Sequence, residues 1–167
     1  MTEYLIQLGH NPIGLLMGLR NHRASLDRLF GFRAALEDHG YKYGDRYCVD
    51  SENNFLGGYN AAKMLMAMPE PPTALFALSD EAGAGALFAL NELGIAVPGQ
   101  VSLAAFGDIA LSKEIWPGIT VVRYPLEKIV EESVKMLIDL VEGRQPGSKQ
   151  VIFPTKIIHR GSIRSLK

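Results

Sequence analysis

Apolar residues occur in short unbroken runs that alternate with longer stretches of helical spacing. Residues 73–78 and 101–106 form apolar runs typical of strands buried on both faces. Apolar residues recur at helical spacing after Ser79, which is a typical helix N-cap, until Gly94 and Pro98 end the pattern. A helical crossover of this length joins parallel strands, so this central stretch is expected to form strand, helix, strand.

The same alternation covers the rest of the chain. Helical spacing predicts further helices at residues 2–8, 24–39, 54–68 and 126–142. Apolar runs predict strands at residues 13–19, 46–50 and 119–123, and one or two more within 151–158, while 109–118 is expected to be a loop. No shift in composition marks a domain boundary within residues 1–167. The predicted fold is α/β, a three-layer sandwich with a mainly parallel sheet.

Composition narrows the classes of function. The length suits one domain, and a net charge of −1 gives no basic excess of the kind that DNA-contacting modules carry. The single cysteine, Cys48, excludes an internal disulfide and fits a reducing compartment. No run is long enough to span a membrane and no signal peptide is recognisable, so a cytoplasmic protein without membrane contact is expected.

Little in the sequence favours catalysis. The four histidines lack the spacing of metal ligands, and surface or loop positions are expected for them. Gly83 and Gly85 fall within a predicted helix rather than in a strand-to-helix turn, which favours close helix packing over a dinucleotide loop. Asp80 and Asp108 follow the carboxyl ends of two neighbouring strands, where ligands bind in open parallel sheets. They form a candidate acid/base pair, but no nucleophile accompanies them.

An ordered set of short motifs resembles the effector-binding core of the LacI/GalR family of bacterial transcription regulators. The set extends over nearly the whole chain: Leu8-Gly9-His10, Arg28, Gly31-Phe32, Ala35-Leu36, Gly58-Tyr59, Pro72-Thr73-Ala74, Ser79-Asp80, Gly85-Ala86, Leu90, Gly94-Ile95, Val97-Pro98, Val101-Ser102, Phe106, Asp108, Pro117, Ile119-Thr120, Arg123 and Pro125. The resemblance implies a fold of the type I periplasmic-binding-protein kind, in which two similar subdomains enclose the ligand.

Within that resemblance, the chain matches the C-terminal subdomain, with residues 125–143 as a crossover helix that normally packs on the other subdomain. The implied function is a ligand-sensing and dimerisation module for a small sugar or sugar acid, without cofactor or metal. Operator DNA would be contacted only through a headpiece that this sequence does not contain. A periplasmic sugar-binding protein fragment and a small α/β enzyme are the alternatives.

The resemblance assigns ligand contacts to positions at the predicted sheet edge. Arg28 falls where the family places a ligand-contacting arginine, although an ion pair with Asp27 or Glu81 is the alternative. Asn53 stands where relatives carry a stacking aromatic, and the neighbouring Phe55 is its possible substitute. The matched edge also includes Ser79 and Asp80.

The next strand end departs from the family. Many relatives carry two consecutive acids there, whereas this chain has Gly107 followed by Asp108. Gly107 implies either a different effector or a bulkier one, and Asp108 is expected to shape the turn. Tyr124, at the implied hinge, lines the cleft or packs within the hinge.

Self-association is expected from two surfaces. The helix at residues 126–142 has a continuous apolar stripe, which requires a partner unless the helix folds back on its own sheet. The helix after Ser79 and the loop from Leu111 to Trp116 resemble the family's subunit contacts, with ordinary loop packing as the alternative. The candidate contacts for a homodimer or larger oligomer are Leu87, Leu111, Ile115, Trp116, Ile129 and Leu137.

Overall fold

The protein is organised around one six-stranded sheet in the order β2-β1-β3-β4-β5-β6. The structure is a computed structural model that describes residues 1–41, 44–145 and 150–167. Strands β1 to β5 run parallel and β6 is antiparallel to β5. Their bounds are β1 Ile13–Met17, β2 Cys48–Asp50, β3 Ala74–Ala77, β4 Ser102–Phe106, β5 Thr120–Arg123 and β6 Lys156–Ile158.

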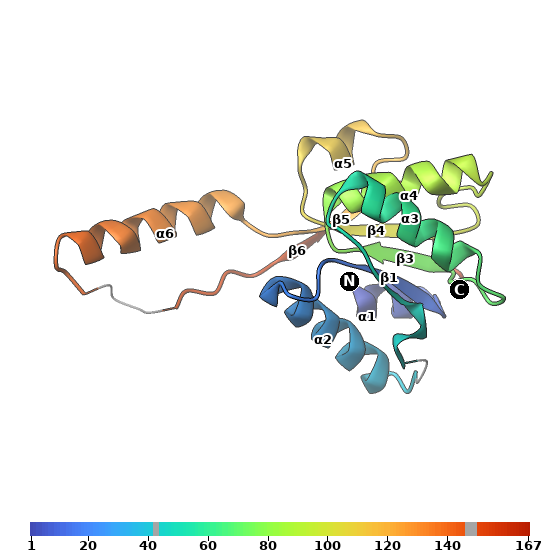
Figure 1. Ribbon diagram of the computed structural model, residues 1–167, viewed down its shortest axis with the longest axis horizontal. Helices are drawn as coiled ribbons and strands as arrows, with labels where there is room; N and C mark the ends of the chain where they lie inside the picture. The colour runs from blue at the N-terminus through green and yellow to red at the C-terminus, as the bar shows by residue number, and fades with distance from the viewer. Residues whose placement is uncertain (42–43, 146–149) are drawn as a thin grey trace.

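Helices cover both faces of the sheet (Figure 1). Helices α1 (Thr2–Gln7) and α2 (Arg23–Asp38) lie on one face, and α3 (Phe55–Met66), α4 (Asp80–Glu92) and α5 (Ala110–Glu114) lie on the other. Alternate side chains of each central strand enter the two cores, since Leu75 and Ala77 join one apolar cluster and Ala74 and Phe76 join the other. The predicted three-layer α/β sandwich is confirmed.

Several local predictions were wrong. Residues 46–50 are not one strand, because a 3-10 turn at Gly44–Tyr47 precedes β2; Tyr47 is buried there and its hydroxyl donates to the carbonyl of Glu70 at 2.9 Å. The expected 109–118 loop contains α5, whose Ser112 is fully buried. His10 does lie in a loop, between α1 and β1, as the sequence allowed, but it is fully buried there, with its ring nitrogens bonded to the Thr73 hydroxyl at 3.2 Å and the Arg164 carbonyl at 3.0 Å.

Glycines allow α3 and α4 to pack backbone against backbone. A Cβ atom on Gly85 would lie 1.9 Å from the carbonyl oxygen of Phe55, and one on Gly58 would lie 2.0 Å from that of Ala82. Such distances are far below van der Waals contact, so neither helix can accept a methyl group without moving apart. The helix-packing interpretation of Gly85 is confirmed.

Gly85→Ala is expected to lower the free energy of unfolding by about 2 kcal/mol, because the methyl group forces the two helices apart. Gly31→Ala is the matched control in α2, where nothing lies within 4 Å of the added Cβ. It should instead stabilise by about 0.5–1 kcal/mol through helix propensity. Urea unfolding of both variants checks this prediction, and equal effects would contradict the close-packing account.

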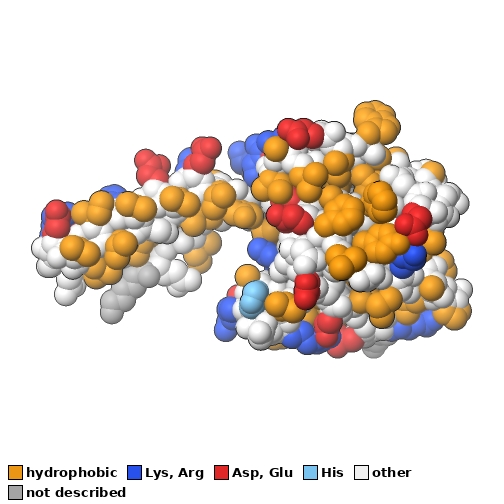
Figure 2. Space-filling view, turned by 45° about the horizontal axis from the view of Figure 1, so that its top comes forward, with side chains coloured by type: hydrophobic (Ala, Val, Ile, Leu, Met, Phe, Trp, Pro, Cys, Tyr) orange, Lys and Arg blue, Asp and Glu red, His pale blue; other side chains and the backbone are white. Residues whose placement is uncertain are grey.

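The helix α6 (Leu126–Val141) projects from the body as an arm (Figure 1). The chain leaves the body after β5 and returns through β6, and none of the α6 residues is buried. Figure 2 shows apolar side chains gathered along this arm; the large exposed ones are Leu126, Val130, Val134, Leu137, Ile138, Leu140 and Val141. The predicted amphipathic helix is confirmed, and it does not fold back on its own sheet.

No helix in the described ranges is both long and apolar enough to span a membrane.

Candidate functional site

Asp80 organises the loop that follows β4. Ser79 caps α4 by accepting the Ala82 N–H at 3.1 Å, which places Asp80 in the first helical turn. The Asp80 carboxylate is 3% exposed and accepts the Asp108 N–H at 2.9 Å and the hydroxyl of Ser112. Ser79 and Asp80 therefore both have structural roles at this edge of the sheet, and the Asp80 carboxylate has little hydrogen-bonding capacity left for a ligand.

Gly107 is required where β4 ends. Its φ is +145°, and a Cβ there would lie 1.6 Å from Oδ2 of Asp80. The buried carboxylate of Asp80 thus occupies the space that a side chain at position 107 would need.

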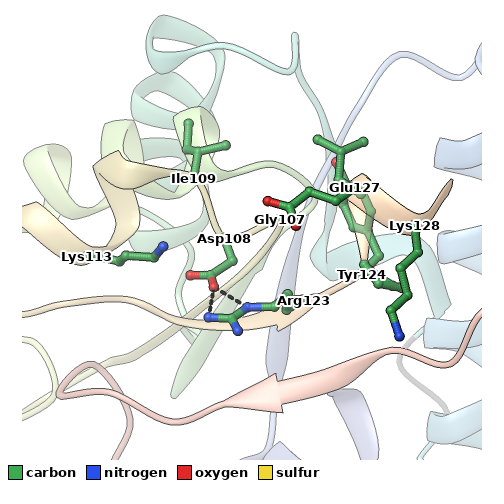
Figure 3. A pocket seen from close by; sticks show the side chains of 10 residues that line it. Gly107, Asp108, Ile109, Lys113, Arg123, Tyr124, Glu127 and Lys128 are labelled. Carbon is green, nitrogen blue, oxygen red and sulfur yellow. Dashed lines mark hydrogen bonds and ion pairs between the residues drawn. The ribbon is translucent and has the colours of Figure 1, made fainter. Parts of the chain in front are cut away.

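Asp108 ties this loop to both segments that connect the body to the arm. Its carboxylate pairs with Arg123 at the end of β5 and with Arg160 after β6, and its side chain is 4% exposed (Figure 3 shows the Arg123 pair). Burial alone would raise the pKa of Asp108, but the hydrogen bonds from Arg160 and Arg123 outweigh burial and hold the pKa below its usual value. The expected role of Asp108 in shaping the turn agrees with this network.

Arg28 projects from α2 onto an aromatic pair at the same edge. Its guanidinium carbon lies 3.8 Å from the centroid of the Phe106 ring, and Nη1 donates to the carbonyl of Leu78 at 3.0 Å. Phe106 in turn stacks on Tyr124, with ring centroids 5.6 Å apart. Burial lowers the pKa of Arg28, against a smaller opposing effect of Tyr124.

The alternative ion pair of Arg28 is absent from the described part of the chain. Asp27 pairs with Arg23 at 2.8 Å instead, and the exposed Glu81 makes no ion pair with Arg28. A half-buried guanidinium therefore stands at the carboxyl edge of the sheet without a carboxylate partner.

Two hollows open along this edge. The larger, about 520 Å³, lies between the loop after β4 and the start of the arm; it is lined by Gly107, Asp108, Ile109, Lys113, Arg123, Tyr124, Pro125, Leu126, Glu127 and Lys128 (Figure 3). The smaller, about 230 Å³, is lined in part by Arg28 and Phe106. Since Phe106 stacks on Tyr124, the aromatic pair connects the linings of the two hollows.

The remaining ligand candidates line neither hollow. The exposed Asn53 lies against Gly18, where its side-chain nitrogen would be 2.4 Å from an added Cβ. Phe55 is 45% exposed and packs on Phe88 with centroids 5.7 Å apart. Among residues 1–41, 44–145 and 150–167, no group of three or more acids, cysteines or histidines is placed to hold a metal ion.

Sequence reasoning did not assign the side chains that support this edge. Arg123 and Arg160 are 15 and 52 residues away from Asp108, and nothing local in the sequence indicates their pairing. Ser112 lies in a stretch expected to be a loop. Phe106 was part of the matched motif set, and its aromatic ring directly after an apolar strand was the one available signal.

The candidate contacts for self-association divide into buried and exposed residues. Leu87 is 3% exposed and belongs to the core, so it cannot form a subunit contact; the next residue, Phe88, faces solvent instead. Leu111, Ile115 and Ile129 are half-buried, Trp116 is 89% exposed and Leu137 is 61% exposed. These five remain available for an interface.

Comparisons with known proteins agree with this architecture. Residues 2–163 match the family described as the periplasmic binding protein-like domain. The probable transcriptional repressor ExuR of Bacillus subtilis is 32% identical over 99% of this chain and 50% of its own length. A LacI-type regulator structure from Bacillus cereus subsp. cytotoxis superposes with a TM-score of 0.95, 31% identity and coverage of 99% of this chain and 59% of that one.

A third similar protein was solved with a sugar. The complex of the transcriptional regulator CelR with cellobiose has a TM-score of 0.91 and 28% identity, and the match covers 96% of this chain and 49% of that one. The chain spans about half the length of the curated relatives it matches. On the family match and these relatives, the chain belongs to the periplasmic binding protein-like family, and it corresponds to the effector-binding part of LacI/GalR-type regulators.

Proposed function

We propose that this chain is the ligand-sensing and dimerisation module of a LacI/GalR-type transcriptional regulator, with a small sugar or sugar-like effector. The family match supports this function, as do relatives named as transcriptional repressors and a relative solved with cellobiose. The same names disfavour the alternatives of a transport protein and a small enzyme. No cofactor belongs to this proposal.

The arrangement of Arg28, Phe106 and Tyr124 is the observation that carries the proposal. A guanidinium presents a planar fork of donors that can hold neighbouring oxygens of a ligand. The two aromatic rings offer apolar surface beside it, which is the usual composition of a small-molecule site. All three residues stand at the carboxyl edge of a parallel sheet, where ligands bind in folds of this class.

In this proposal the chain is one part of a longer regulator, and the rest of that regulator completes the ligand cleft and contacts DNA. Residues 1–167 form the C-terminal subdomain, and the arm centred on α6, residues 125–143, packs on the other subdomain in the longer protein. That subdomain supplies the second wall of the ligand cleft, and operator DNA is contacted through the remaining part. Such a regulator works in the cytoplasm.

Calorimetry against a panel of sugars and sugar acids tests the ligand assignment. Because one wall of the cleft is missing, binding by this chain is expected in the millimolar range. Arg28→Ala should weaken it about tenfold or more. Cys48→Ala is the control, since Cys48 lies on β2, lines neither hollow, and has a pKa raised to about 11 by burial.

Two results would contradict this assignment. Micromolar binding by the isolated chain would show that a second wall is not needed. Equal affinities of the wild type and Arg28→Ala would show that the ligand binds elsewhere.

A further inference from the structure

The two carboxylates that follow β3 and β4 are both engaged by the protein itself. An ionised carboxylate can hold a sugar hydroxyl by accepting a hydrogen bond from it. Here the oxygens of Asp80 are taken by the Asp108 N–H and by Ser112, and those of Asp108 by Arg123 and Arg160. Neither of the two carboxylates at the strand ends is free to accept from a ligand.

No third carboxylate can be placed at the end of β4. A side chain at Gly107 would overlap Oδ2 of Asp80, since its Cβ would lie 1.6 Å from that oxygen. The packing of Asp80 therefore excludes a hydrogen-bond-accepting side chain at position 107. The neighbouring Asp108 does not replace it, because its carboxylate is paired with Arg123 and Arg160.

Cations outnumber acids in the lining of the larger hollow, whereas the smaller hollow is lined by Arg28 and by one acid, Glu3, with which Arg28 makes no ion pair. Arg28 is half-buried and has no carboxylate partner among the described residues, while Asp108 alone serves two arginines. Lys113 and Lys128 add positive charge to the lining of the larger hollow, where Glu127 is the one acid besides Asp108. A partly desolvated cation is stabilised when an anion approaches it, because the pair is poorly screened there.

We propose that the effector is a sugar acid, whose carboxylate is bound by the guanidinium of Arg28. This proposal rests on the proposed function as an effector sensor and names the chemical class of the effector. The fork of Arg28 donates to both carboxylate oxygens, and Tyr124 and Phe106 contact the sugar ring. Gly107 is the specificity-determining position, because an acidic side chain there would repel the carboxylate of such a ligand and glycine carries none.

The test compares charged and neutral sugars that differ at one carbon. Galacturonate and glucuronate are titrated into the 167-residue chain at constant ionic strength, beside galactose, glucose and glucuronamide, with NMR chemical shifts as the readout. The acids should bind at least tenfold more tightly than their neutral partners. Raising the salt concentration from about 50 to 500 mM should weaken the binding of the acids only.

Substitutions in α2 test whether the preference for sugar acids over neutral sugars depends on Arg28. Arg28→Met should remove the preference for the acids, and Arg28→Lys should retain part of it because a point charge remains. Arg33→Met is the matched control, since Arg33 lies on the same helix but pairs with Asp45 at 2.6 Å. The comparison of acids with neutral sugars on the wild-type chain stands even if an Arg28 variant fails to fold.

The outcomes separate this inference from the proposed function. Neutral sugars that bind as tightly as the acids, through Arg28, would overturn the acid effector and leave the sugar sensor intact. A preference for acids that persists in folded Arg28→Met would overturn the assignment to Arg28. Absence of binding by every sugar and acid up to about 50 mM would overturn both proposals.

Discussion

Ile129→Glu combined with Leu137→Glu is expected to convert a self-associated chain into a monomer. The arm carries its large apolar side chains in water, including Leu137 at 61% and Val141 at 79% exposure. Burying one Leu, Ile or Val side chain contributes about 1.5–3 kcal/mol, so a stripe of them strongly favours any partner that covers it. In the isolated chain the available partner is a second copy, which can exchange α6 because the 123–125 hinge lies outside the helix.

Light scattering after size exclusion measures this effect. The wild-type chain is expected as a homodimer or larger oligomer, and the double variant at half that mass or less with its sheet still folded. Glu131→Gln with Lys135→Gln is the control, since both side chains are exposed on the same helix and the net charge is unchanged. A wild-type monomer at high micromolar concentration would rule out the exposed stripe as an interface.

The fold was predictable where local signals coincide. The unit β3-α4-β4 follows from two apolar runs, the Ser79 cap and the Gly94 ending, and the structure reproduces it within one or two residues. Amphipathic spacing likewise predicted α6. Helix α5 was missed because its five residues carry no periodic pattern and its position depends on the contact of Ser112 with Asp80.

The candidate site was predictable only in part, because it is assembled from residues distant in sequence. The position of Arg28 in α2 followed from motif order, but its contact with Phe106 depends on how α2 packs across the sheet. The burial of Leu87 was also not predictable, since consecutive residues of α4 point in different directions and place Leu87 in the core and Phe88 at the surface. No local pattern distinguishes these two apolar neighbours.

Asp108→Ala is expected to lower the free energy of unfolding by about 3 kcal/mol at neutral pH. Removing one member of a largely buried ion-pair network leaves the other charges uncompensated. Here the side chains of Asp108 and Arg160 are 4% and 15% exposed, so Arg160 would lose its buried partner, while the 47% exposed Arg123 can turn to solvent. The backbone adds to the loss, because φ of Asp108 is +132°, where alanine is disfavoured.

Asp108→Asn separates charge from backbone strain, since asparagine tolerates positive φ better than alanine. It should retain part of the stability that Asp108→Ala loses. Asp27→Asn is the matched control, because the Asp27 pair with Arg23 is exposed and such pairs contribute about 0.5 kcal/mol or less.

The Asp108 contribution should also disappear in acid. The pKa of Asp108 is lower in the folded chain than the ordinary value near 3.8, so its stabilisation is complete above that value and is lost as the pH falls through the folded pKa. Urea unfolding from about pH 6 to pH 2 should therefore show the wild type and Asp108→Asn converging in acid, with the gap between them constant above about pH 5. A gap that persists at pH 2, or none at pH 7, would show that the two arginines do not stabilise this loop through the Asp108 charge.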